Sequence, residues 1–124
     1  MSLPDFDILN FSYDWNHKLS CTAFTTIRLD QAKYAVGSYW AIHLNGKQRR
    51  NNLFMIRERK TFLLEEITNY MAYIDTGYDA AKCREIIMTM YKNSHLNWKN
   101  QRLCMPLIVE THYSLDPQQA KLFS

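Results

Sequence analysis

The hydrophobic pattern of this chain changes its period at Leu63. Before Leu63, short runs of β-branched and aromatic residues alternate with polar ones, as expected of strands that bury one face. After it, apolar residues recur at every third or fourth position, which is the spacing of an amphipathic helix. A chain with several short strands, then two helical segments and a last apolar run, is typical of the α+β class.

Four strands are predicted ahead of this change in period. We place them at residues 8–11, 24–29, 39–44 and 53–56, the last one continued by charged residues as far as residue 60. Asn45-Gly46 follows the third strand and is the commonest two-residue hairpin connection. In the second strand, alternation places Phe24, Thr26 and Arg28 on one face. We therefore expect Thr26 and Arg28 to act on the same side of the sheet.

Two helices are predicted after the strands. The first covers about three turns, and its apolar stripe consists of Leu63, Ile67, Tyr70, Met71 and Ile74. Asp79 is placed to cap the second helix. The stripe of that second helix consists of Cys83, Ile86, Ile87, Met90 and Tyr91. Few helices and several short strands in a chain of this size indicate a small β-barrel decorated by helices.

A closing strand is predicted at residues 103–109. Pro106 lies inside it and has no amide hydrogen to donate, so the strand is expected at a sheet edge or at a bulge. Residues 114–124 are interpreted as a tail. The chain of 124 residues is therefore predicted to form one domain over 1–124.

Composition limits the class of protein. The chain is 47% hydrophobic and 22% charged, a balance that supports one buried core and argues against disorder. Its three cysteines contain no CxxC pair and its four histidines show no ligand spacing, so no disulfide framework, metal or other cofactor is expected. No run of about 18 apolar residues and no secretory signal is present, which predicts a cytoplasmic protein without membrane contact.

Positive charge is concentrated in one segment, although the formal net charge is only +3. Between residues 47 and 60, a single acid, Glu58, accompanies six basic residues: Lys47, Arg49, Arg50, Arg57, Arg59 and Lys60. Such a segment can follow a nucleic-acid backbone, with Tyr39 and Trp40 as stacking faces. The alternative is a solvated hairpin whose charges protect a sheet edge.

The segment LSCTAFTTIR, from Leu19 to Arg28, resembles the signature of the ASCH family. Leu19, Thr26 and Arg28 match that signature, whereas Cys21, Ala23 and Phe24 replace its glycine, lysine and first threonine. The resemblance covers about residues 8–110 and implies a PUA-like β-barrel whose cleft takes RNA or a modified nucleoside. Some small family members are acetylcytidine amidohydrolases that use the lysine, the later threonine and a downstream glutamate. The glutamate position falls near Asp75 and Thr76 in this chain.

The leading hypothesis is a binding module for RNA or a nucleoside-like ligand, with little or no catalysis. Arg28 offers a planar donor fork beside the Thr26 hydroxyl, which suits a phosphate or a base edge. The alternative is that Arg28 only pairs with Asp30 or Glu110 to seal a barrel end. The predicted binding residues are Thr25, Thr26, Arg28, Trp40, Lys47, Arg49, Arg50, Arg57, Asp75 and Tyr78.

Two other functions stay open at this point. A nucleoside or RNA hydrolase requires another group to replace the amine that is missing at Ala23, and Lys18 or Asp75 is placed to do so. A protein-interaction domain would use an apolar surface near the closing strand. For the junction of the two helices, the plain interpretation is that Asp79 caps a helix while Tyr78 packs against it.

Overall fold

The computed structural model describes residues 2–116, and its elements follow the predicted α+β order. The strands are β1 (Phe6–Phe11), β2 (Ala23–Thr25), β3 (Arg28–Leu29), β4 (Tyr39–Leu44), β5 (Lys47–Gln48), β6 (Asn52–Leu63) and β7 (Arg102–Ser114). The helices are α1 (Asn69–Thr76) and α2 (Ala80–Met90), with 3₁₀ turns η1 (Trp15–Ser20), η2 (Leu64–Glu66) and η3 (Lys92–Ser94). The predicted tail at 114–124 begins inside β7 at Ser114, and its residues 117–124 lie outside the described part.

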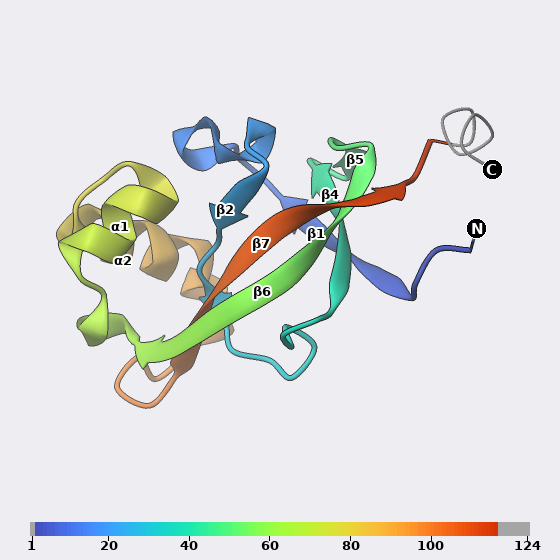
Figure 1. Cartoon of the computed structure of the whole chain (residues 1–124). Helices are drawn as coiled ribbons and strands as arrows, with labels where there is room; N and C mark the ends of the chain where they lie inside the picture. Colours follow the sequence, from blue (N-terminus) through green and yellow to red (C-terminus); the bar gives the residue numbers. More distant parts are fainter. Residues whose placement is uncertain (1, 117–124) are drawn as a thin grey trace.

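All strands belong to one sheet with the order β1-β4-β6-β7-β2, to which β3 adds through β7 and β5 through β4. β1 runs parallel to β4, and the other pairs are antiparallel. The long strands β6 and β7 cross the whole molecule, and both helices pack at one end of them (Figure 1). No backbone pairing between β1 and β2 or β3 closes the sheet in the described residues, so a complete barrel is not confirmed.

The strand residues predicted at 24–29 separate two hydrophobic cores, as their alternation indicated. Phe24 faces the first core, where the sheet curves around Trp40, Phe54, Ile56 and Ile108. Ile27 and Leu29 face the second core, which joins the sheet to the helices through Phe62, Leu103, Cys83 and Ile87. Consecutive side chains of one short segment therefore contribute to opposite sides of the sheet, and the segment lies between both cores.

Pro106 explains why this segment is split into β2 and β3. The pairings Thr25 with Leu107 and Arg28 with Cys104 keep one register, which sets Thr26 opposite Pro106. Glu110 N donates to Thr22 O, so even-numbered β7 residues direct their backbone groups toward β2 and β3. Pro106 has no hydrogen to donate there, and the ladder is interrupted. Of the two predicted positions, the sheet edge is wrong, because β7 is an inner strand. The other, a bulge, has a counterpart in β6, whose pairing with β7 shifts register between Ile56 and Glu58, next to Pro106.

The first helix is shorter than predicted and buries another face. Leu63 still belongs to β6, and α1 starts after Thr68, whose hydroxyl caps it by accepting from Met71 N. Tyr70 and Ile74, which the stripe placed in the core, are 75% and 44% exposed. The helix instead buries Ala72, Asp75 and Thr76. The prediction failed because the buried face carries the polar side chains of Asp75 and Thr76, which are paired with Lys18 and with the Ala72 carbonyl.

The cap of the second helix and the hairpin agree with the sequence, whereas Met90, which the stripe placed in the core, is 54% exposed. Asp79 caps α2 by accepting a 2.9 Å hydrogen bond from Lys82 N, and Cys83 and Ile87 are buried. Asn45 and Gly46 both have positive φ, as a two-residue hairpin between β4 and β5 requires. In the described residues, no helix is both long and apolar enough to cross a membrane.

Candidate functional site

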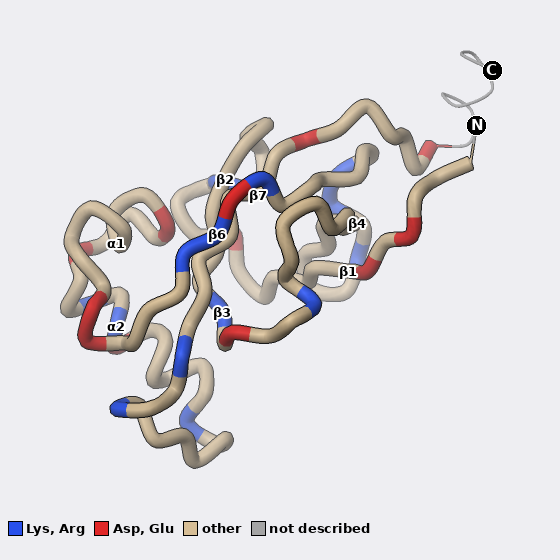
Figure 2. Tube along the Cα trace, turned by 60° about the horizontal axis from the view of Figure 1, so that its bottom comes forward, with Lys and Arg blue, Asp and Glu red and all other residues tan. Residues whose placement is uncertain are grey.

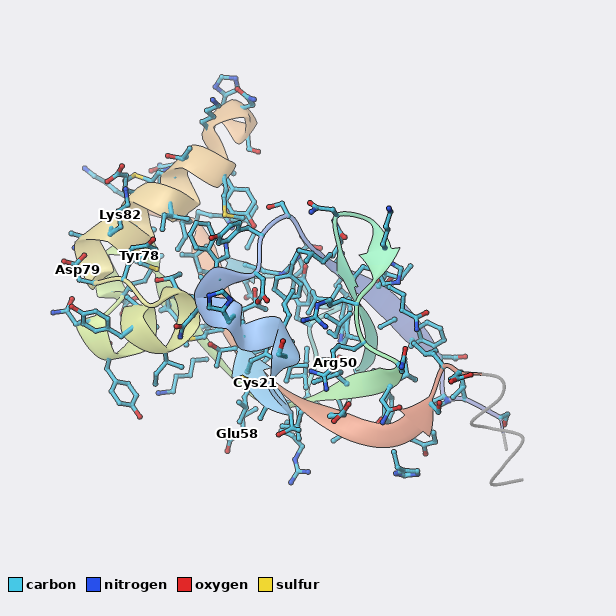
Figure 3. All side chains as sticks on the ribbon, turned by 90° about the horizontal axis from the view of Figure 1, so that it is seen from above. Cys21, Arg50, Glu58, Tyr78, Asp79 and Lys82 are labelled. Carbon is cyan, nitrogen blue, oxygen red and sulfur yellow. The ribbon has the colours of Figure 1, made fainter. Side chains whose placement is uncertain are left out.

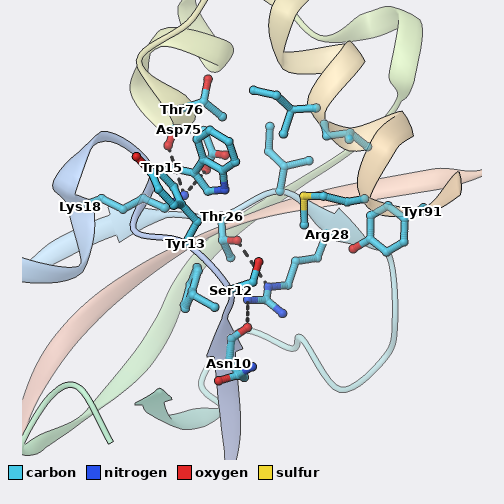
Figure 4. Close-up of a pocket in the computed structure, with 15 residues that line it drawn as sticks. Asn10, Ser12, Tyr13, Trp15, Lys18, Thr26, Arg28, Asp75, Thr76 and Tyr91 are labelled. Carbon is cyan, nitrogen blue, oxygen red and sulfur yellow. Dashed lines mark hydrogen bonds and ion pairs between the residues drawn. The ribbon is translucent and has the colours of Figure 1, made fainter. Parts of the chain in front are cut away.

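A pocket of about 170 Å³ opens where the break between β2 and β3 meets the end of β1 and the two helices. Its floor contains Thr26, Arg28, Lys18 and Asp75, and Tyr13, Trp15 and Tyr91 provide aromatic walls (Figure 4). Thr26 lies opposite Pro106, so the pocket lies at the position where the sheet ladder is interrupted. The predicted pair Thr26 and Arg28 therefore lines the same pocket.

Arg28 is held in this pocket without a carboxylate. Its Nε donates to Thr26 Oγ1 at 3.4 Å, and its Nη2 donates to the backbone carbonyl of Asn10 at 2.8 Å. The guanidinium also lies over the ring of Phe11, 4.7 Å from its centroid. Nη1 has no hydrogen-bond partner in residues 2–116, so it keeps donors for a ligand.

The two acids that were candidates to neutralise Arg28 are paired elsewhere. Asp30 forms an ion pair with Arg59, and Glu110 forms one with Arg50. Arg28 makes no ion pair within the described part of the chain. The alternative interpretation, in which Arg28 only seals a barrel end against Asp30 or Glu110, is therefore wrong.

Lys18 and Asp75 form a buried ion pair beside Arg28. The Lys18 Nζ atom lies 3.0 Å from Asp75 Oδ1 and also donates to the Asp75 backbone carbonyl at 3.2 Å. Thr25 Oγ1 donates to the same Oδ1 at 3.0 Å. Every buried side-chain oxygen or nitrogen in residues 2–116 has a partner, and Asp75 Oδ2 makes no hydrogen bond. Asp75 is 5% exposed and lines the pocket, so Oδ2 is the carboxylate oxygen that stays free of protein hydrogen bonds there.

Burial shifts the pKa values of this pair. Burial lowers the pKa of the Lys18 ammonium from its usual value, and the charge of Asp75 opposes that shift. Burial likewise raises the pKa of the Asp75 carboxyl, against the opposing effect of Lys18 and of the Thr25 hydrogen bond. Shifts of this kind bring a proton donor and a proton acceptor closer together in pKa, as in sites that transfer protons.

The part of the aromatic wall formed by Trp15 belongs to η1, which contains two residues with positive φ. Asn16 and His17 have φ of 58° and 52°, a region that residues other than glycine rarely occupy. Trp15 contacts Tyr13 at a centroid distance of 4.6 Å and Tyr78 at 6.3 Å. Gly77, with φ of +80°, ends α1 in the left-handed conformation that glycine favours. It also packs closely on Asn16, since a Cβ atom at position 77 would lie 3.1 Å from Asn16 Oδ1. These contacts hold Trp15 against the pocket.

The predicted basic segment lies away from the pocket, and none of its residues lines it. Arg50 donates to the carbonyls of Leu19 and Cys21 and pairs with Glu110, so it fixes the loop after η1 (Figure 3). Arg49 donates to Ser20 Oγ. Lys47 is exposed on the short strand β5, and Arg57 is exposed on β6. Basic and acidic residues follow one another along β6, so this strand is not uniformly positive (Figure 2).

Two aromatic residues that were predicted to bind the ligand, Trp40 and Tyr78, differ in their exposure. Trp40 is 1% exposed in the first core, donates to Ser38 Oγ and packs on Tyr34, so its expected role as a stacking face is wrong. Tyr78 is 47% exposed but does not line the pocket. It contacts Trp15 instead, and in this way supports the wall from the helical side.

Sequence reasoning missed several pocket residues. Asn10, Tyr13, Trp15 and Tyr91 line the pocket, and none of them was among the predicted binding residues. Tyr91 was assigned to the core stripe of α2, and its helical spacing gave no sign that it faces a cavity. In the described residues, no three His, Cys, Asp or Glu side chains are grouped as metal ligands.

The comparisons with known proteins show a shared fold. No family model matches the chain, and no curated protein matches it. The crystal structure of protein EF3133 from Enterococcus faecalis V583, of family DUF984, is similar with a TM-score of 0.63 and 13% identity. That match covers 98% of this chain and 83% of the other. The crystal structure of hypothetical protein PH0355 is similar with a TM-score of 0.58 and 8% identity, over 86% of this chain and 98% of that one. The chain therefore shares its α+β fold with these two proteins.

Proposed function

We propose that the pocket binds one nucleoside-like ring, as the resemblance of Leu19, Thr26 and Arg28 to the ASCH family implies. The observation that carries this proposal is Arg28, whose guanidinium lines the pocket with Nη1 unengaged by the described residues. Asp75 Oδ2 adds an acceptor nearby, so a base edge that carries both a carbonyl and an N–H group finds complementary partners. The same resemblance leads us to propose that the fold is PUA-like.

The dimensions of the pocket favour a single ring over a polynucleotide strand. A cavity of about 150 Å³ is enough for a benzene ring, and this pocket has a volume of about 170 Å³. Trp15 and Tyr91 offer flat faces on which a base can stack. Of the predicted basic segment, no residue lines the pocket. We therefore propose a free nucleoside, or one base flipped out of a strand, as the ligand.

Titration with nucleosides tests this function. Cytidine, acetylcytidine, uridine and adenosine are added to the full chain while amide shifts are followed by NMR. We expect at least one of them to shift the resonances of Thr26, Arg28 and Trp15. Arg28→Gln should weaken that ligand by about tenfold, as expected for a charge-assisted hydrogen bond. Arg102→Gln removes an exposed arginine that bonds Thr61, outside the pocket, and should leave binding unchanged. Equal loss in both variants, or no shift with any nucleoside, refutes the proposal.

A second candidate function, hydrolysis of a nucleoside amide, is favoured by the position of Lys18. Ala23 stands where the family has a lysine, and the Lys18 ammonium, which lies 3.0 Å from Asp75 Oδ1, can replace that amine. In such a reaction, Asp75 takes a proton from a water molecule that attacks the amide carbonyl, and Lys18 gives a proton to the leaving amine. Arg28 stabilises the oxyanion that forms. The products are a carboxylic acid and the free amine.

Release of acetate from acetylcytidine tests this second function. We expect turnover in the wild type and its loss in Asp75→Asn, whereas Arg102→Gln should remain active. If the wild type shows no turnover, hydrolysis is excluded. If Thr26→Ala retains full turnover, the reaction does not take place in the pocket that Thr26 lines. Nucleoside binding in the preceding titration is a separate readout, so the binding function can stand when hydrolysis fails.

A further inference from the structure

A second surface lies on the outer face of the sheet, apart from the pocket. The pairings of β1, β4, β6, β7 and β2 set one row of side chains across that face: Phe6, Tyr39, Met55, Val109 and Ala23. Phe6 is 44% exposed, and Tyr39, Met55 and Val109 are half-buried. The row runs across five neighbouring strands and is apolar apart from one phenol hydroxyl.

The helices cover only the other half of this face. Thr25, on the same side of the sheet as Ala23 and one step closer to the helices, already contacts Asp75 of α1. Beyond it, Ile27 and Met105 belong to the core that joins sheet and helices. Both helices lie at that end of β6 and β7 (Figure 1). The half of the face that carries Tyr39 and Val109 is left without a covering helix in the described residues.

An open groove of about 330 Å³ follows the uncovered row. Tyr39 and Tyr113 meet edge to face in it, with ring centroids 5.5 Å apart. The His112 ring stacks on Tyr113 at 4.4 Å. His112 is exposed and the other two rings are half-buried. Flat aromatic faces are therefore available next to an apolar floor, which is the arrangement on which unpaired bases stack.

The charges of the groove favour an anionic ligand. Its carboxylate, Glu110, is paired with Arg50 at 2.9 Å. Its guanidinium, Arg57, lies where the pairing of β6 with β7 shifts register between Ile56 and Glu58, and it is exposed. Arg57 makes no ion pair within the described residues. A bulge often re-aims a side chain in this way, and here it leaves a donor fork beside the aromatic rings.

We propose that this groove binds a single-stranded nucleic acid, whose bases stack on Tyr39 and Tyr113 and whose phosphate meets Arg57. An anionic group next to flat rings is what the groove complements, and a polynucleotide repeats that combination at every residue. An apolar peptide would leave the Arg57 guanidinium without an anion. The site is independent of the pocket, because the two share no lining residue.

Fluorescence anisotropy with a labelled single-stranded RNA of about 12 nucleotides tests the proposal, since one small β-domain covers about 4–16 nucleotides. Tyr113→Ala should weaken binding at least about fivefold through loss of a stacking face, and Tyr113→Phe should restore it. The matched control is Tyr70→Ala, which removes a tyrosine that is 75% exposed on α1 and should have no effect. Circular dichroism confirms that each variant is folded.

Salt dependence tests the role of Arg57. Arg57→Ala should reduce the slope of log affinity against log salt by about 0.7, the contribution of one phosphate contact on a single strand. Lys82→Ala removes the same charge from α2, where the Lys82 side chain is 50% exposed, and should keep the slope of the wild type (Figure 3). Equal effects of these two variants indicate a general electrostatic attraction and overturn the proposal.

Three further outcomes would overturn it, and each one is distinct from failure of the pocket. Duplex RNA that binds as tightly as the single strand excludes stacking. Displacement of the RNA by a saturating nucleoside, or its loss in Arg28→Gln, places the strand in the pocket instead. Sedimentation that shows a dimer in the wild type and a monomer in Tyr113→Ala assigns the groove to a second copy. RNA binding that survives in Arg28→Gln supports the groove even if no nucleoside enters the pocket.

Discussion

Arg28 on β3 donates a 2.8 Å hydrogen bond from Nη2 to the backbone carbonyl of Asn10 on β1. These two strands lie at opposite ends of the sheet order, and no backbone ladder joins them in the described residues. The guanidinium also packs on the Phe11 ring, and Phe11 contacts Phe24 across the same gap. One side chain therefore links the two edges of the sheet while it forms the floor of the pocket.

Arg28→Ala should lower the free energy of unfolding by about 1–3 kcal/mol, the usual effect of losing a hydrogen bond from a charged group. Arg28→Lys should recover only part of this, because an ammonium cannot reach Thr26 and Asn10 with the same planar fork. Urea denaturation measures both values. Arg102→Ala, which removes an exposed hydrogen bond to Thr61, should change stability by less than about 0.5 kcal/mol. A similar loss in Arg102→Ala would contradict a linking role for Arg28.

The buried pair Lys18 and Asp75 gives a second prediction. Lys18→Met or Asp75→Asn alone should destabilise the fold by about 3–5 kcal/mol, because each leaves one buried group without its partner. The double variant Lys18→Met/Asp75→Leu should lie closer to the wild type than the sum of the two single losses, since it leaves no buried charge. Thermal and urea unfolding of the four proteins measures the coupling. Additive losses would mean that the two groups do not interact.

Much of the fold follows from local pattern. The hairpin at Asn45-Gly46, the Asp79 cap of α2 and the two-faced alternation around Thr26 are each determined by neighbouring residues, so the sequence was enough to predict them. The extent of α1 was not predictable in this way. Tyr70 and Ile74 have the spacing of a core stripe, but the burial of Asp75 depends on Lys18, which is 57 residues away.

Only the part of the candidate site that depends on neighbouring residues could be predicted. Thr26 and Arg28 adjoin in one segment and match a family pattern, whereas Tyr13 and Tyr91 reach the pocket from distant elements. The basic segment also shows the limit of charge counting. Arg50 and Arg59 are neutralised by Glu110 and Asp30, partners that no local pattern identifies.

The buried thiol of Cys83 on α2 gives a prediction about pH. Burial, followed by the charge of Asp75, raises the pKa of this thiol from 9.0 to about 11. The folded chain therefore holds its proton between pH 9 and 11, where the unfolded chain releases it, so the stability contributed by the thiol is complete below pH 9 and is lost as the pH rises. We expect the difference in free energy of unfolding between wild type and Cys83→Ala to decrease over this interval. Urea titrations at several pH values measure it, and a difference that stays constant contradicts the shift.

Pro106 gives the last prediction, because it connects the sheet to the pocket. Its missing amide hydrogen interrupts the ladder opposite Thr26, and Thr26 and Ile27 both line the pocket at that break. Pro106→Ala supplies the missing donor, so we expect the new amide at position 106 to bond the Thr26 carbonyl and to join β2 and β3 into one strand. Hydrogen exchange followed by NMR should show this amide protected to the same degree as that of Ile108. Thr26 is then drawn toward β7, and any nucleoside bound by the wild type should bind more weakly. Pro4→Ala, at a half-buried position that precedes β1, is the matched control and should change neither exchange nor binding. Rapid exchange at position 106 would show that the break has another cause than the proline.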